Sequence, residues 1–187
     1  MPTDLARLPD PVAALGRLPA GAAVILRDAG HPEREAVARA LRAATSRRGQ
    51  VLLVSGDPEL ADRVRADGLH LPERDVGGAA ARTWRRRNPH RLLSAAAHSL
   101  AALRRAAGSG CDVVLLSPVF PTASHPGAPA LGPYRAAAMA RSVGVPVLAL
   151  GGVEAGTLGR LPPVFAGIAA IGLFAILRPR LPAVGSQ

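Results

Sequence analysis

Short apolar runs alternate with longer helical stretches along almost the whole chain, and this alternation constrains the fold more than any other feature. Seven runs are predicted to be β-strands because they are continuous and rich in Val, Leu, Ile and Ala. They are Ala22–Arg27, Val51–Ser55, Gly68–Leu71, Arg91–Ala96, Asp112–Ser117, Pro146–Leu150 and Gly167–Gly172. Continuous apolar strands are typical of a parallel sheet that is covered on both faces. The sequence therefore predicts an α/β protein built from successive β/α units.

The stretches between these runs carry the usual signals for helix ends. Pro32 suits a first helical turn, and Gly49 suits the end of the same helix. Asp57 precedes Pro58, so its carboxylate is expected to cap the next helix. Ser99 is a further expected cap, and Asp10–Arg17 is expected to form a short helix before the first strand.

The number of units favours a (β/α)8 TIM barrel over an open doubly wound sheet. Only seven apolar strands are found, so the barrel is expected to lack or truncate its first strand. One such domain is expected to span residues 1–187. Because a barrel builds its active site at the C-terminal ends of its strands, the residues directly after each strand are the candidate functional residues.

All 23 cationic residues are arginines, and they give a net charge of +10. The absence of lysine excludes Schiff-base catalysis and a lysine clamp on a phosphate. The basic stretch Arg82–Arg91 could contact a nucleic-acid backbone, with Trp84 available for stacking. Its place on a crossover helix favours a solvated helix face instead, so nucleic acid is not an expected partner.

Cysteine usage and apolar run lengths indicate a soluble, cytoplasmic protein without a membrane partner. A single cysteine, Cys111, cannot form an internal disulfide, which fits a reducing compartment. The first ten residues lack the apolar core of a signal peptide. The longest apolar run, which starts at Val164, is shorter than the about 20 residues that a membrane helix needs.

Glycines follow the last two predicted strands at Gly151, Gly152 and Gly172. Backbone N–H groups at such positions can bind a phosphate without a charged side chain. Paired glycine turns in consecutive units of a barrel therefore predict a phosphate site.

Several longer motifs together resemble the thiamine-phosphate synthase and thiazole tautomerase superfamily. The motifs are ADGLHLPERD, AAHSLAAL, DVVLLSPVFPTASHPGAPALGP, GVPVLALGGV and AGIAAIG, and the resemblance runs in order from Ala22 to Ala175. It implies a (β/α)8 barrel whose first strand ends in Thr-Asp. Thr3-Asp4 is similar to that ending, which suggests a first strand clipped at Met1.

The resemblance also implies a reaction and its ligands. The synthase joins hydroxymethylpyrimidine diphosphate to a thiazole phosphate: pyrophosphate leaves, and the thiazole nitrogen captures the pyrimidine carbocation. Mg²⁺ is the implied cofactor, with Asp75 as its carboxylate ligand and Asp57 as a second candidate. Arg27 is the implied diphosphate contact, and Thr122, Ser124 and His125 form the implied diphosphate-binding loop.

Other positions depart from the family pattern. The family lysine that follows the strand-end arginine is Ala29 here, and the family Asn-Asp pair falls on Ser55 and Gly56. Two family serines are Ala96 and Ala175. These departures predict an eroded active site.

Two alternatives to the synthase activity stay open. His98, with Ser99, matches the histidine that acts as acid and base in the thiazole tautomerases, so His98 is the candidate catalytic residue of a tautomerase-like enzyme. The other alternative is a non-catalytic member that binds a phosphate ligand. His70 is expected to be structural, and a missing strand would favour a homodimer.

Overall fold

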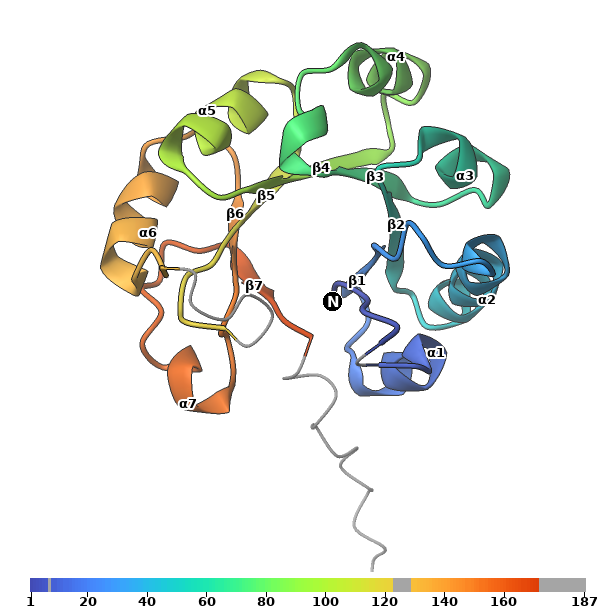
Figure 1. Ribbon diagram of the computed structural model, residues 1–187, viewed down its shortest axis with the longest axis horizontal. Coiled ribbons are helices and arrows are strands. Elements are labelled where there is room, and N and C mark those ends of the chain that lie inside the picture. Colours follow the sequence, from blue (N-terminus) through green and yellow to red (C-terminus); the bar gives the residue numbers. More distant parts are fainter. Residues whose placement is uncertain (7, 123–128, 172–187) are drawn as a thin grey trace, which may run out of the picture.

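A computed structural model describes residues 1–6, 8–122 and 129–171 of the 187-residue chain. Seven parallel strands form one sheet in sequence order, with helices outside it (Figure 1). The strands are β1 (Ala23–Leu26), β2 (Val51–Ser55), β3 (Gly68–Leu71), β4 (Leu92–Ala97), β5 (Val113–Leu116), β6 (Val147–Leu150) and β7 (Gly167–Ala169). The helices are α1 (Pro11–Ala14), α2 (Arg34–Arg47), α3 (Pro58–Arg63), α4 (Ala79–Arg87), α5 (Leu100–Gly108), α6 (Pro133–Arg141) and α7 (Ala155–Leu158), with 3-10 turns η1 (Leu15–Arg17) and η2 (Glu73–Asp75).

The prediction of α/β architecture with seven parallel strands is confirmed. The sheet curves into a half-barrel, and a complete eight-stranded barrel is not seen among residues 1–6, 8–122 and 129–171. In place of a first strand, Met1 to Thr3 make a single parallel bridge to β1 at Pro2 and Ile25. The Thr3 N–H donates to the Ile25 carbonyl at 2.8 Å, and the Ile25 N–H donates to the Met1 carbonyl at 2.9 Å. The Met1 side chain is buried in the larger apolar cluster of the protein.

The two faces of the sheet carry different side chains, because successive residues of a strand point to opposite faces. The outer face packs against the helices through residues such as Val24, Leu52 and Leu69, in the larger of two apolar clusters. The inner face holds a small cluster of Ile25, Leu53, Leu115 and Ala169, with three partly buried neighbours. Side chains on the inner face at the C-terminal strand ends are therefore the ones that line the mouth of the half-barrel.

At the N-terminal ends of the strands, remote from the mouth, two aspartates make the same pattern of hydrogen bonds. Asp67, directly before β3, accepts the Leu52 N–H at 2.8 Å and pairs with Arg42 of α2 at 2.7 Å. Asp112, directly before β5, accepts the Leu93 N–H at 2.7 Å and pairs with Arg85 of α4. Each aspartate thus extends the hydrogen-bond ladder to its neighbouring strand and ties a helix to it.

Arg85 belongs to the basic stretch that the sequence places on a crossover helix, and that placement is confirmed. Besides Asp112, its guanidinium donates to the carbonyls of Arg91 at 2.9 Å and Gly110 at 3.0 Å. The Arg85 side chain therefore stabilises the loops before β4 and β5. None of the helices in the described part of the chain has the length and hydrophobicity that crossing a lipid bilayer requires.

Candidate functional site

The candidate residues predicted from the strand ends lie at one end of the sheet. The strands are parallel, so the segments that follow them meet at the same edge (Figure 1). The described members are Arg27 after β1, Asp57 after β2, Asp75 in η2, His98 after β4, Thr122 in the loop after β5, and Gly151 and Gly152 after β6. The predicted residues Ser124, His125 and Gly172 lie outside the described residues.

Arg27 is exposed at this end, and the N-terminal segment orients it. Its Nε donates to the Thr3 carbonyl at 3.1 Å, and its backbone N–H donates to Thr3 Oγ1 at 3.1 Å. Thr3 Oγ1 donates in turn to the Asp28 carboxylate, which also accepts the Leu5 N–H at 2.9 Å. Burial acts to raise the pKa of Asp28, but these two hydrogen bonds, a third from its own backbone N–H and the charge of Arg27 together lower that pKa. The guanidinium is thus held in place next to an ionised carboxylate.

Asp57 has both carboxylate oxygens engaged within the protein. Oδ1 accepts the Leu60 N–H at 2.8 Å as the N-cap of α3, and Oδ2 pairs with Arg34 Nη1 at 3.0 Å. Arg34 is itself buried and also donates to the Ser55 carbonyl at 2.6 Å. The expected capping role is confirmed, and it leaves Asp57 a poorer candidate for metal binding than Asp75.

Asp75 is half-buried, and its carboxylate faces Gly56. A Cβ on Gly56 would lie 3.9 Å from Asp75 Oδ2 and 3.5 Å from the Pro72 side chain. The nearest cation is the neighbouring Arg74, whose Nε is 3.7 Å from Asp75 Oδ1. Within the described residues no group of three or more His, Cys, Asp or Glu side chains could hold a metal ion. A single carboxylate fits Mg²⁺ in one common mode, in which substrate phosphates and waters supply the other ligands.

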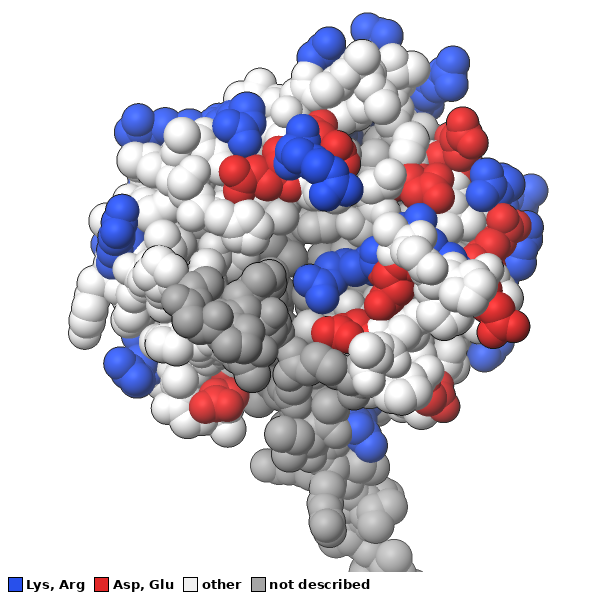
Figure 2. Space-filling view, viewed as in Figure 1, with Lys and Arg blue, Asp and Glu red and all other residues white. Residues whose placement is uncertain are grey.

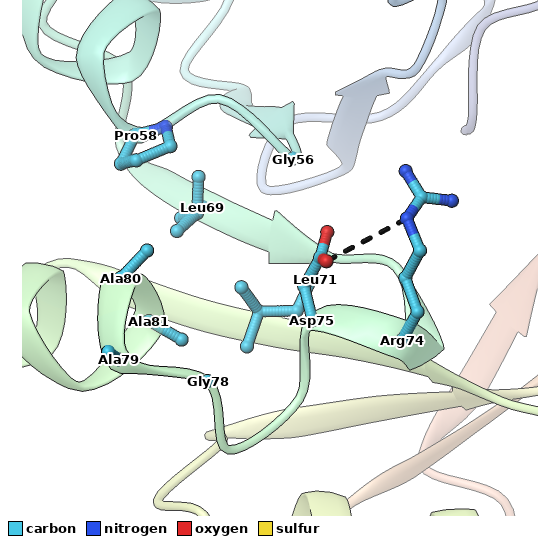
Figure 3. Close-up of a pocket in the computed structure, with 10 residues that line it drawn as sticks. All are labelled: Gly56, Pro58, Leu69, Leu71, Arg74, Asp75, Gly78, Ala79, Ala80 and Ala81. Carbon is cyan, nitrogen blue, oxygen red and sulfur yellow. Dashed lines mark ion pairs between the residues drawn. The ribbon is translucent and has the colours of Figure 1, made fainter.

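A cavity of about 290 Å³ opens beside Asp75, between the N-termini of α3 and α4 (Figure 3). Its wall lies on the outer face of β3, because Leu69 and Leu71 line it while His70 points to the inner face. The remaining lining is small or apolar apart from Arg74 and Asp75. Asp75 therefore stands between this cavity and the mouth of the half-barrel.

His98 is exposed at the C-terminal end of β4, with its ring oriented by Ser117. Nδ1 lies 2.9 Å from the Ser117 carbonyl and 3.1 Å from Ser117 Oγ. A carbonyl oxygen can only accept, so Nδ1 carries a proton, and in the neutral ring the lone pair is then on Nε2. An imidazole in this tautomer can accept a proton at Nε2.

The structure shows why glycine is required at positions 151 and 152, which the sequence did not reveal. Both adopt left-handed backbone angles, with φ of 87° and 64°. A Cβ on Gly152 would lie 2.3 Å from the Pro121 carbonyl oxygen, and one on Gly151 would lie 2.7 Å from the Pro118 Cα. The Phe120 N–H also donates to the Gly151 carbonyl at 3.0 Å. The glycines thus let the β6 turn contact the segment that leads to Thr122, and phosphate binding by their N–H groups stays a prediction.

A buried polar row lies on the inner face just below the mouth, and sequence reasoning missed it as a unit. Ser55, His70 and Ser94 are register partners across β2, β3 and β4, and all three are buried. His70 Nδ1 lies 2.8 Å from Ser94 Oγ. Burial, together with the charge of Arg27, lowers the pKa of His70 to about 4. His70 is therefore neutral at pH 7 and part of the core, as expected.

The charges around the mouth are mixed. In Figure 2, which looks onto the same side as Figure 1, acidic side chains lie beside basic ones over much of the face. An uninterrupted basic patch suited to a nucleic-acid backbone is not seen on the described part of this face.

A family model, curated relatives and one solved structure point to the same family. A family model described as thiamine monophosphate synthase matches residues 11–172. The chain is 36% identical to the putative thiamine-phosphate synthase 2 of Aquifex aeolicus, over 70% of this chain and 69% of that protein. It is 35% identical to the thiamine-phosphate synthase of Thioalkalivibrio sulfidiphilus, over 80% of this chain and 71% of that protein. Among solved structures, thiamine phosphate pyrophosphorylase from Pyrococcus furiosus superposes with a TM-score of 0.75 at 25% identity, covering 91% of this chain and 82% of the other.

Proposed function

The chain belongs to the thiamine monophosphate synthase family of thiamine biosynthesis, and from that premise we propose that it couples a pyrimidine diphosphate to a thiazole phosphate with release of pyrophosphate. In this reaction the bond between the pyrimidine methylene carbon and the diphosphate oxygen breaks. The thiazole nitrogen then supplies the electron pair for the new C–N bond. The protein's task is to bind the diphosphate, orient the two rings and exclude water from the carbocation.

The observation that carries the proposal is the placing of Asp75. Its carboxylate is half-buried at the end of β3, faces Gly56, and has no cation closer than 3.7 Å in the described chain. An ionised carboxylate in this position would hold Mg²⁺, which supplies charge neutralisation for the departing pyrophosphate. Arg27, whose guanidinium is exposed and oriented by Thr3, would bind the same diphosphate.

In the proposal, the turn after β6 binds the phosphate of the second substrate, the thiazole phosphate. Gly151 and Gly152 adopt left-handed backbone angles directly after the strand, and their backbone N–H groups are the proposed donors to a phosphate. We assign the thiazole phosphate to this side of the mouth. The two phosphate-bearing substrates then enter from opposite sides, with their rings between them.

The barrel itself is proposed to be completed by the N-terminal segment. Met1 to Thr3 occupy the place of a first strand beside β1, with two ladder hydrogen bonds to Ile25. In this arrangement Thr3 stands at a strand end and joins the other candidate residues. Its hydrogen bonds to Arg27 give the segment a direct part in the site.

Thiamine phosphate formation tests the proposal. Purified protein is incubated with both substrates with and without Mg²⁺, and product is measured by thiochrome fluorescence. We expect Mg²⁺-dependent product and a loss of about 100-fold or more in kcat for Asp75→Asn, because the variant removes the anionic metal ligand without changing its size.

Asp62→Asn is the matched control, since that exposed aspartate pairs with Arg91 on the outer surface. We expect it to retain activity. Absence of product from the parent protein, with thiazole phosphate still bound, would reject the synthase activity in favour of a tautomerase or a binding role. His98→Ala would then separate those two.

A further inference from the structure

Glu73 connects three segments around the mouth through one carboxylate. Its Oε2 accepts the backbone N–H of His98 at 2.8 Å, and its Oε1 lies 3.5 Å from Arg105 Nη2 of α5. Glu73 also begins the η2 turn, which ends at Asp75. The segment after β3, the segment after β4 and helix α5 are therefore joined at a single side chain.

The link to His98 is the stronger of the two contacts. A backbone N–H bonded to a carboxylate is a charge-assisted hydrogen bond, and 2.8 Å is a well-formed distance for one. The Arg105 side chain is 47% exposed and 3.5 Å away, so water screens that ion pair. The consequence of losing Glu73 should thus fall mainly on His98 and on the η2 turn.

The His98 ring is held at a second point, which makes the backbone contact matter for the side chain. Nδ1 donates to the Ser117 carbonyl at 2.9 Å, with Ser117 Oγ at 3.1 Å. Glu73 fixes the main chain of His98 and Ser117 fixes its ring. If the main chain moves, the ring cannot keep its hydrogen bond to Ser117, and the tautomer is no longer specified.

We propose that Glu73 is a positioning residue of this site: it holds Asp75 and His98, which follow the neighbouring strands β3 and β4, at a constant separation. The proposal deepens the synthase activity and rests on it for its kinetic consequences. The proposal assigns Glu73 no contact with either substrate. It acts through the η2 turn on one side and through the His98 backbone on the other.

Three variants separate the contacts of Glu73. Glu73→Ala removes both, Glu73→Gln keeps an acceptor for the His98 N–H but loses the charge, and Arg105→Ala removes only the ion pair. The matched control is Glu35→Ala, which removes an exposed carboxylate of α2 that pairs with Arg39 and Arg63.

Two readouts are measured on each protein. The first is kcat and KM for thiamine phosphate formation. We expect Glu73→Ala to lower kcat about tenfold and to raise KM for the pyrimidine diphosphate, because misplaced groups lose transition-state contacts. Glu73→Gln should recover most of kcat, and Arg105→Ala and Glu35→Ala should stay within about twofold of the parent protein.

The second readout is the ¹⁵N NMR spectrum of the His98 imidazole, recorded without substrates or Mg²⁺. We expect the Nδ1–H tautomer in the parent protein and a mixture of tautomers in Glu73→Ala. An unchanged His98 spectrum in Glu73→Ala would overturn the proposal, as would an Arg105→Ala variant that reproduces every effect of Glu73→Ala.

If the parent protein makes no thiamine phosphate, the synthase assignment fails, and the spectrum alone decides whether Glu73 positions His98. If Glu73→Ala does not fold, a Glu73→Gln spectrum identical to the parent's supports the hydrogen bond as the link, and a disturbed one contradicts it.

Discussion

Buried titratable side chains are expected to influence how this protein responds to pH. His70 is the main example, because it is a titratable group enclosed by strands with Ser94 as its hydrogen-bond partner. Cys111 is a second buried titratable group, and burial raises its pKa to about 11. The thiol therefore stays protonated and unreactive at neutral pH.

His70 should make the protein less stable in acid. The unfolded chain takes up a proton at His70 near pH 6.5, whereas the folded chain takes it up only near pH 4. Between these values the unfolded state binds more protons, so the free energy of unfolding falls as the pH falls, by about 3 kcal/mol in total. Urea unfolding at pH 7 and pH 5 should give a smaller difference for His70→Gln than for the parent protein.

His90→Gln is the control for this measurement, because His90 is exposed on the surface. It should keep the pH dependence of the parent protein. Equal pH dependence in the parent protein and in His70→Gln would show that His70 is not the group responsible.

Gly152 should tolerate no side chain. Its Cβ would lie 2.3 Å from the Pro121 carbonyl, and its φ of 64° is strained for any other residue. We expect Gly152→Ala to lower the free energy of unfolding by about 2 kcal/mol or more. Gly156→Ala is the comparison, since nothing lies within 4 Å of a Cβ there and Ala suits helix α7. Thermal unfolding of both variants checks the difference, and equal melting temperatures would contradict it.

At the level of elements, aspartates before β3 and β5 secure the N-terminal ends of these strands to their neighbours. Asp67 joins β3 to β2 and α2, and Asp112 joins β5 to β4 and α4. At the other end, Glu73 makes a similar connection between segments. The same contact, made by an aspartate directly before a strand, thus occurs before β3 and again before β5.

Asp112→Ala should destabilise the protein mainly through its hydrogen bond to the main chain. The Leu93 N–H would lose its partner in a buried strand, at a cost of about 1–3 kcal/mol. Asp112→Asn keeps an acceptor and should cost less, because the partly exposed ion pair with Arg85 contributes little by itself. A double-mutant cycle with Arg85→Ala in urea separates the two contributions, and an equal loss for Ala and Asn would assign the effect to the charge instead.

For the molecule as a whole, the alternation of apolar runs predicted the strands well. Six of the seven have ends within about two residues of those expected, and the last is seen as Gly167–Ala169. Strand ends also predicted that Arg27, Asp75 and His98 would lie at one edge of the sheet, where they are observed, and their functional roles stay predictions. The resemblance to thiamine-phosphate synthase was confirmed by the comparisons.

Contacts that depend on register could not be predicted in this way. Ser55, His70 and Ser94 meet only because β2, β3 and β4 are staggered as they are, and no single segment encodes that stagger. The role of Glu73 depends on the path of two separate loops. The close approach that requires Gly152 similarly involves a segment about thirty residues away in the chain.

The aspartates at the N-terminal ends of the strands have a consequence for how the sequence of such a protein can evolve. Asp67 and Asp112 hold strands and helices together at the end remote from Arg27, Asp75 and His98. The groups that keep neighbouring units in register are therefore largely separate from the groups that would meet a ligand. Substitutions at the mouth can then alter which molecules are recognised while the folded framework persists, which gives this architecture room to acquire new specificities one residue at a time.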